Sequence, residues 1–73
     1  MHEALEVKAP MTGQVTSIHI QVGVTVQQGD VLIALEAMKM ENQIRAPRPG
    51  VVIEILTTEG AVVHSGELLA VLD

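Results

Sequence analysis

The sequence lacks several residue types that hold small proteins together. It has 73 residues, no cysteine and no phenylalanine, tyrosine or tryptophan. Without disulfides the fold depends on burial alone, and a chain of this size is near the lower limit for a single hydrophobic core. The hydrophobic fraction is 48%, so Val, Ile, Leu, Ala and Met have to build that core. Because β-branched residues favour strands, we expect one all-β domain spanning residues 1–73.

Positive charge is also scarce. Four Lys and Arg residues stand against nine Asp and Glu residues, for a formal net charge of −5. Neutralising phosphates requires a cluster of basic side chains, so nucleic acid is excluded as a partner. No apolar run approaches the roughly 20 residues of a membrane helix, and Met1–Glu6 lacks the basic start and apolar run of a signal peptide. We therefore expect no membrane partner and a cytoplasmic location.

No pattern typical of catalysis or metal binding is visible. His2, His19 and His64 are isolated, and none has a neighbour at metal-ligand spacing. Glu36 and Glu41 form a pair of carboxylates suited to acid–base chemistry, but the sequence provides no cleft around them, and keeping a turn solvated explains both. We expect no catalytic residue, no metal site and no independent enzyme.

The chain repeats its own pattern after 37 positions, an offset that carries Lys8-Ala9-Pro10 onto Arg45-Ala46-Pro47. Glycines and apolar residues match together as far as the end of the chain, which chance does not explain. The matched pairs are Gly13 and Gly50, Val15 and Val52, Ile18 and Ile55, Gly23 and Gly60, Val26 and Val63, Gly29 and Gly66, Leu32 and Leu69, and Leu35 and Leu72.

Each repeat is too short to bury its own apolar face, so the two halves should pack on each other as a pseudo-twofold pair of sheets. This predicts a flattened β-barrel or sandwich of two four-stranded sheets. Glycines at matching turns supply the positive φ angles of tight corners, an architectural role. Val15 and Ile18 are an odd number of residues apart, as are Val52 and Ile55, which predicts a β-bulge or a strong twist at the same place in both halves.

The segment Glu36-Ala37-Met38-Lys39-Met40-Glu41-Asn42 joins the two repeats. It lies between the extended, apolar-rich segments Val31–Leu35 and Gln43–Arg45, which predicts Lys39 at the tip of a hairpin. Pseudo-twofold symmetry places the chain termini at the opposite end. A lysine in a surface turn usually serves solubility, but methionine is an unusual choice for an exposed turn. Two methionines around a lysine form an apolar collar that a partner can bind.

The same segment resembles the biotin-attachment signature of the biotin carboxyl carrier domain, the biotinyl/lipoyl attachment domain of biotin-dependent carboxylases. The resemblance covers nearly the whole chain and includes four further segments. They are Ala9–Gly13, the Gly29-Asp30 corner, Ile44–Pro47 and Gly66–Leu69.

This resemblance implies that biotin, as the cofactor, is attached covalently to Lys39. It also implies that biotin protein ligase recognises Met38 and Met40, together with Glu36 and Ala37. A lysine amine is almost wholly protonated at neutral pH, so its acylation requires an outside enzyme that supplies an activated acyl group and a base.

In this family a biotin carboxylase uses ATP and bicarbonate to carboxylate the biotin, and a carboxyltransferase passes the carboxyl group to an acceptor. The resemblance implies both enzymes as partners, and a mitochondrial matrix location if the chain comes from a eukaryotic carboxylase. Two features depart from the family pattern: Thr12 stands where many members have proline, and the short Gln21–Val24 connection leaves no room for the thumb insertion of some members. The domain therefore resembles the thumbless type.

Two other functions fit the same fold. A lipoyl carrier domain of a 2-oxo acid dehydrogenase complex also has a hairpin lysine, but usually has an acidic residue at the position of Met38. An unmodified lipoyl-like structural module needs no lysine signature at all. Lys39 with its two methionines therefore favours the biotin carrier over both alternatives.

Overall fold

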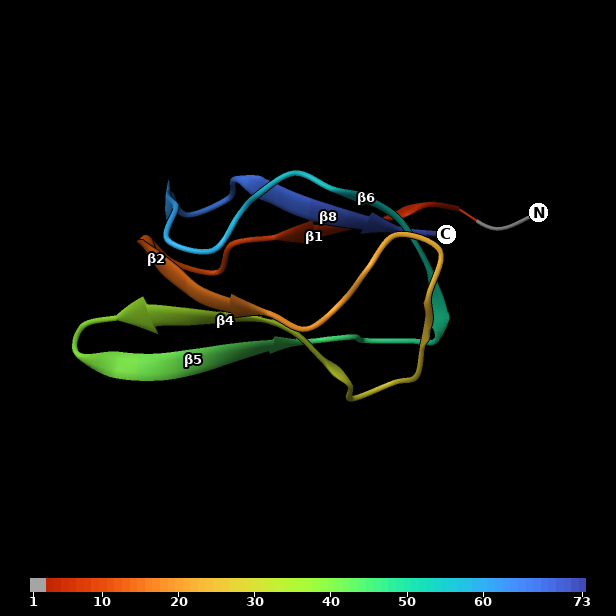
Figure 1. Cartoon of the computed structure of the whole chain (residues 1–73), viewed down its shortest axis with the longest axis horizontal. Helices are drawn as coiled ribbons and strands as arrows, with labels where there is room; N and C mark the ends of the chain where they lie inside the picture. The colour runs from red at the N-terminus through yellow and green to blue at the C-terminus, as the bar shows by residue number, and fades with distance from the viewer. Residues whose placement is uncertain (1–2) are drawn as a thin grey trace.

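The computed structural model describes residues 3–73, which form eight β-strands (Figure 1). Met1 and His2, the start of the expected domain, lie outside the described residues. The strands of the first half are β1 (Leu5–Lys8), β2 (Gly13–Ile18), β3 (Thr25–Val26) and β4 (Val31–Ala37). Those of the second half are β5 (Met40–Arg45), β6 (Gly50–Ile55), β7 (Val62–Val63) and β8 (Leu68–Leu72).

The strands form two four-stranded antiparallel sheets, in the orders β1-β8-β6-β3 and β5-β4-β2-β7. The sequence offset carries each strand of one sheet onto a strand of the other, which confirms the predicted pair of pseudo-twofold-related sheets. They pack as a sandwich with extents of 39 × 18 × 17 Å. Each sheet takes two strands from each half, so the two repeats interleave rather than form one sheet apiece. Neither half can therefore complete a sheet without the other.

The corners of the two halves have the same backbone geometry. Gly23 and Gly60 have φ angles of 93° and 90°, in the left-handed region that favours glycine. Gly23 N–H donates to the carbonyl of Val52 at 2.7 Å, and Gly60 N–H donates to that of Val15 at 2.8 Å. The symmetry predicted from side-chain types thus extends to individual backbone hydrogen bonds.

Both predicted β-bulges are present. The register of β2 against β4 shifts between Val15 and Ser17, and the register of β6 against β8 shifts between Val52 and Glu54. An extra residue bends a strand and increases its twist. The bulges therefore explain how apolar residues an odd number of positions apart lie on the same buried side.

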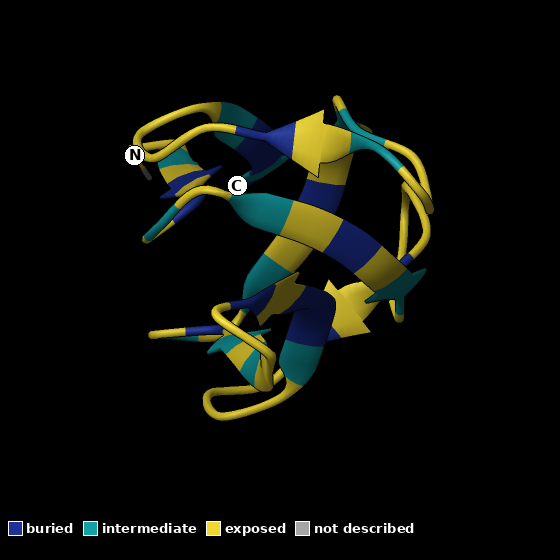
Figure 2. Ribbon diagram, turned by 90° about the vertical axis from the view of Figure 1, so that its left-hand side faces the viewer, coloured by how far each residue is buried: buried dark blue, intermediate teal, exposed yellow. Residues whose placement is uncertain are grey.

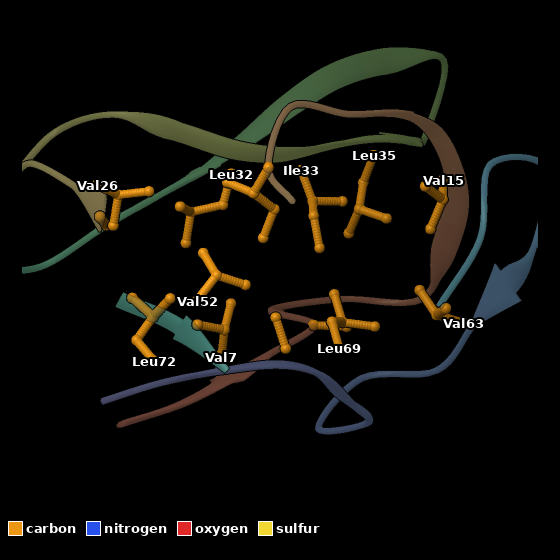
Figure 3. Close-up of a cluster of buried hydrophobic side chains, with 14 residues drawn as sticks. Val7, Val15, Val26, Leu32, Ile33, Leu35, Val52, Val63, Leu69 and Leu72 are labelled. Atoms are coloured by element: carbon orange, nitrogen blue, oxygen red, sulfur yellow. The ribbon is translucent and has the colours of Figure 1, made fainter. Parts of the chain in front are cut away.

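The core lies between the two sheets, and most strands carry both buried and less buried positions (Figure 2). More and less buried residues alternate in β1, whereas residues 32–35 of β4 are all buried. Leu32 and Leu35 of β4 are fully buried at 0% exposure, as are their repeat counterparts Leu69 and Leu72 of β8. Figure 3 shows the β4 side chains on one side of this core and Val7, Val52 and Leu69 on the other. Residues 3–73 include no buried polar or charged side chain, so burial of aliphatic side chains stabilises this fold.

Arg48 joins the two ends of the described chain. Its Nη2 donates to the carbonyl of Glu3 at 2.7 Å, and its Nη1 donates to Pro49 at 3.0 Å and, weakly, to Asp73 at 3.5 Å. The repeat counterpart of Arg48 is Met11, which has no such donor. We expect Arg48→Met to lower the free energy of unfolding by about 1 kcal/mol. It should also speed amide hydrogen exchange near both chain ends, measured by NMR or mass spectrometry.

The matched control is Arg45→Met. Arg45 donates to the Gly29 carbonyl at 2.8 Å and to Gln43 at 2.6 Å, so its loss should speed exchange at that corner and leave the chain ends unchanged. Equal protection of the ends in wild type and Arg48→Met would contradict this role of Arg48.

Candidate functional site at the β4–β5 hairpin

The loop between β4 and β5 consists of only Met38 and Lys39. Ala37 pairs with Met40 across the hairpin, and Glu36 pairs with Glu41. Figure 1 shows this turn at one extremity of the long axis, with the C-terminus at the other. Lys39 therefore lies at the hairpin tip, and the C-terminus lies at the opposite end, both as predicted.

The tip has an unusual backbone. Met38 and Lys39 have φ angles of 54° and 63°, as a type I′ turn requires at its two central residues. Elsewhere in residues 3–73, positive φ occurs only at the glycines Gly23, Gly29, Gly60 and Gly66. A residue with a side chain is less stable in this region by about 1–2 kcal/mol. The hairpin thus keeps two side chains where glycine fits more easily, and such strain is typical of functional sites.

The side chains around the tip are open to solvent. Met38 is 91% exposed and Met40 is 67% exposed, and Lys39, Glu36 and Glu41 are exposed as well. Two glutamates directly opposite each other on a hairpin repel slightly. The one ion pair within residues 3–73 joins Lys8 to Glu6 at 3.6 Å, so neither glutamate holds the Lys39 amine.

Ala37 differs from the other residues expected to contact a ligase, because it is only 6% exposed. It lies directly before the two-residue tip and packs near Gly13. A Cβ atom placed on Gly13 would lie 3.2 Å from the Ala37 Cβ and 2.6 Å from the Glu36 carbonyl oxygen. Sequence reasoning assigned Gly13 to architecture alone. The sequence did show that Gly13 matches Gly50 in the repeat. That match does not reveal that the end of β4 packs against Gly13.

Thr12 is the position at which the sequence departs from the family's proline. Its hydroxyl accepts a hydrogen bond from the backbone N–H of Ser65 at 3.3 Å. Thr12 therefore connects the start of β2 to the corner before β8 by a contact that proline cannot make.

The described part of the chain holds no pocket and no group of three or more His, Cys, Asp or Glu side chains placed to bind a metal ion. Among residues 3–73, no helix is long and apolar enough to cross a membrane. The chemical feature that stands out is the exposed amine at the hairpin tip.

A small β-sandwich that displays one lysine at the tip of a strained hairpin, with its C-terminus at the far end, belongs to the class of carrier domains that hold a cofactor on a side chain. A family model described as "Biotin-requiring enzyme" matches residues 5–72. The chain belongs to this family. It is a biotin carrier domain of the kind found in biotin-dependent carboxylases, its cofactor is covalently attached biotin, and it is not catalytic by itself.

Individual relatives support this assignment. The chain is 39% identical over 64 residues to the biotin-dependent acyl-coenzyme A carboxylase alpha3 subunit of Mycobacterium leprae, covering 88% of this chain and 11% of that protein. The Kluyveromyces lactis urea carboxylase structure superposes with a TM-score of 0.90 at 34% identity, over 100% of this chain and 6% of that one. The chain thus spans a small part of the carboxylases it matches.

A lipoyl domain also shares the fold. The lipoyl domain of the 2-oxoglutarate dehydrogenase complex from Azotobacter vinelandii superposes with a TM-score of 0.81 at 32% identity, over 93% of this chain and 94% of that one. Biotinyl and lipoyl carriers therefore share this sandwich, and the residues at the hairpin have to distinguish them.

The strain at the tip leads to a stability prediction. Met38→Asn should raise the free energy of unfolding by about 0.5–1 kcal/mol, because asparagine tolerates positive φ and is favoured at this position of a type I′ turn. Urea denaturation measures the change. In the control Met40→Asn, which substitutes a residue in β5, asparagine is a poor strand former, so stability should fall slightly. A Met38→Asn variant less stable than wild type would argue against strain at the tip.

Proposed function

We propose that Lys39 is the residue to which biotin is attached, and that residues 1–73 form a single domain that carries a carboxyl group between two enzyme sites. The observation that carries this proposal is the position of Lys39, exposed at a two-residue tip. The chain has one other lysine, Lys8, which lies within β1 and pairs with Glu6. A ligase can enclose the tip, whereas the β1 ladder holds the backbone of Lys8 against β8.

Attachment forms an amide bond between Nζ of Lys39 and the carboxyl carbon of biotin. The ammonium group loses one proton to become the nucleophile and a second as the N–C bond forms and the bond to the activating group breaks, so the positive charge of the side chain disappears. When bound, biotin supplies the ureido nitrogen that carries the carboxyl group. The protein supplies a rigid sandwich and a hairpin tip, which keep the cofactor at high local concentration near both enzyme sites.

Recognition by biotin protein ligase is assigned to the exposed residues of the tip. Met38 and Met40 offer apolar, adaptable side chains on the two sides of the lysine, and Glu36 offers a carboxylate. Since Ala37 is buried, it acts on recognition through the position of the hairpin rather than by contact. The ligase therefore has both an apolar collar and a negative charge to bind.

The names of the relatives support two enzyme partners for this domain. They include an acyl-coenzyme A carboxylase subunit, the gamma subunit of a methylmalonyl-CoA decarboxylase and pyruvate carboxylase. These names support a biotin carboxylase and a carboxyltransferase as the two sites visited. We place the domain in the cytoplasm, or in the mitochondrial matrix in a eukaryotic cell. The name of the rat methylcrotonoyl-CoA carboxylase subunit, which is given as mitochondrial, supports the second location.

The decisive experiment is the intact mass of the chain after co-expression with a biotin protein ligase and free biotin, followed by peptide mapping. We expect one biotin adduct, on the peptide that contains Lys39. A parallel culture uses lipoate and a lipoate ligase, because the shared fold makes the lipoyl carrier the second candidate. A lipoyl adduct without a biotin adduct would overturn the proposal in favour of the lipoyl carrier. No adduct in either culture would favour an unmodified structural module.

A further inference from the structure

Gly13, the first residue of β2, lies against the end of β4 next to the hairpin tip. The next residue, Gln14, pairs with Glu36 of β4, and Gly13 itself pairs with Val63 of β7. A Cβ atom on Gly13 would lie 2.6 Å from the Glu36 carbonyl oxygen, closer than real Cβ atoms approach backbone. Glycine is thus the one residue that lets β2 lie this close to β4 without a shift in one of them.

The repeat provides the same contact at the other end of the molecule. A Cβ atom on Gly50, the counterpart of Gly13, would lie 2.7 Å from the carbonyl oxygen of Asp73. Neither glycine has a positive φ angle, so close approach rather than backbone conformation requires glycine at both places. The two contacts differ in the segment that crosses the glycine. For Gly13 it is the strand that leads into the hairpin, and for Gly50 it is Asp73, which directly follows β8 and is not part of the hairpin.

A side chain added at Gly13 would displace the hairpin. Glu36 and Ala37 are the last residues of β4 before the tip, and Ala37 pairs with Met40 on the other strand. A push on the Glu36 carbonyl therefore shifts both strands and the turn between them. On the far side, β5 is an edge strand of its sheet, so no further strand resists the movement.

We infer that Gly13 is a positioning residue for the modified lysine. By allowing close contact between β2 and β4, it sets the direction in which the hairpin presents Lys39 to the enzymes that acylate it. This inference rests on the function proposed for Lys39, and it gives Gly13 a role that its counterpart Gly50 does not share.

The test compares Gly13→Ala with Gly50→Ala. Both variants should lose stability to urea by similar amounts, because both introduce the same kind of overlap. At a temperature where both are folded, kcat/KM for biotinylation of Lys39 should fall by about tenfold in Gly13→Ala and stay at the wild-type value in Gly50→Ala. Amide chemical shifts of the hairpin, residues 36–42, should move in Gly13→Ala only.

Equal kcat/KM values in the two folded variants would overturn the inference, whether both equal the wild-type value or both fall. If Gly13→Ala does not fold, Ala37→Val overfills the same contact from the hairpin side and is compared with Gly50→Ala in its place. Failure of the underlying function is distinguishable, because wild-type protein would then take up no biotin. If wild type and Gly13→Ala are biotinylated equally fast, only the positioning role of Gly13 is refuted.

Discussion

Lys39→Arg is expected to take up no biotin at all while the domain keeps its fold. An arginine keeps the charge and length of the side chain, but its guanidinium does not lose a proton at accessible pH and is not acylated. Because residue 39 is exposed at a turn, the substitution should change the free energy of unfolding by less than about 0.5 kcal/mol. Intact mass after co-expression with ligase and biotin measures the first effect, and urea denaturation measures the second.

The matched control is Lys8→Arg, which changes the other lysine of the chain. Lys8 lies in β1 and pairs with Glu6, so this variant should be biotinylated as fast as wild type. A biotin adduct on Lys39→Arg, or loss of the adduct in Lys8→Arg, would show that the attachment site had been assigned to the wrong residue.

The largest effects on stability are expected in the core, at Leu32 and Leu69. Both side chains are fully buried, and they occupy equivalent places in the two sheets. Truncation of a buried leucine to alanine costs roughly 2–5 kcal/mol, whereas a domain of this length has a total stability of about 4–11 kcal/mol. Leu32→Ala and Leu69→Ala should each lower stability by about 3 kcal/mol, and the two values should agree within about 1 kcal/mol.

Urea denaturation followed by circular dichroism provides these values. The control is Val62→Ala, because Val62 is 65% exposed and its truncation should cost no more than about 0.5 kcal/mol. A loss of 3 kcal/mol at one leucine and none at the other would mean that the pseudo-twofold symmetry of the backbone does not extend to the energetics of the core.

The hairpin concentrates the features that a modifying enzyme can recognise. Its two methionines are among the most exposed large apolar side chains of the domain, although methionine usually fills cores. Its central residues adopt a conformation that glycine adopts at every other such position in residues 3–73. These two observations come from the structure, and they support the interpretation that the side chains at positions 38–40 are retained for binding and modification rather than for folding.

Local features of the sequence were sufficient to predict much of this protein. The β-branched composition and the extended apolar-rich segments predicted strands, and the odd spacing of the apolar residues after Val15 and Val52 predicted the two bulges. Glycine pairs such as Gly23 and Gly60 predicted the corners, and the apolar segments around Lys39 predicted the hairpin. These features could be read from the chain because each depends on a few neighbouring residues, whose steric limits are the same in any protein.

Only the tertiary structure decided which strands share a sheet and which residues lie beneath the hairpin. Leu5 pairs with Leu72 at the other end of the chain, so each sheet draws on both repeats, and the sequence alone did not predict this exchange. The burial of Ala37 and its contact with Gly13 were likewise decided by packing. Such contacts join residues far apart in sequence, and their geometry is set by the combined packing of both sheets rather than by local preference.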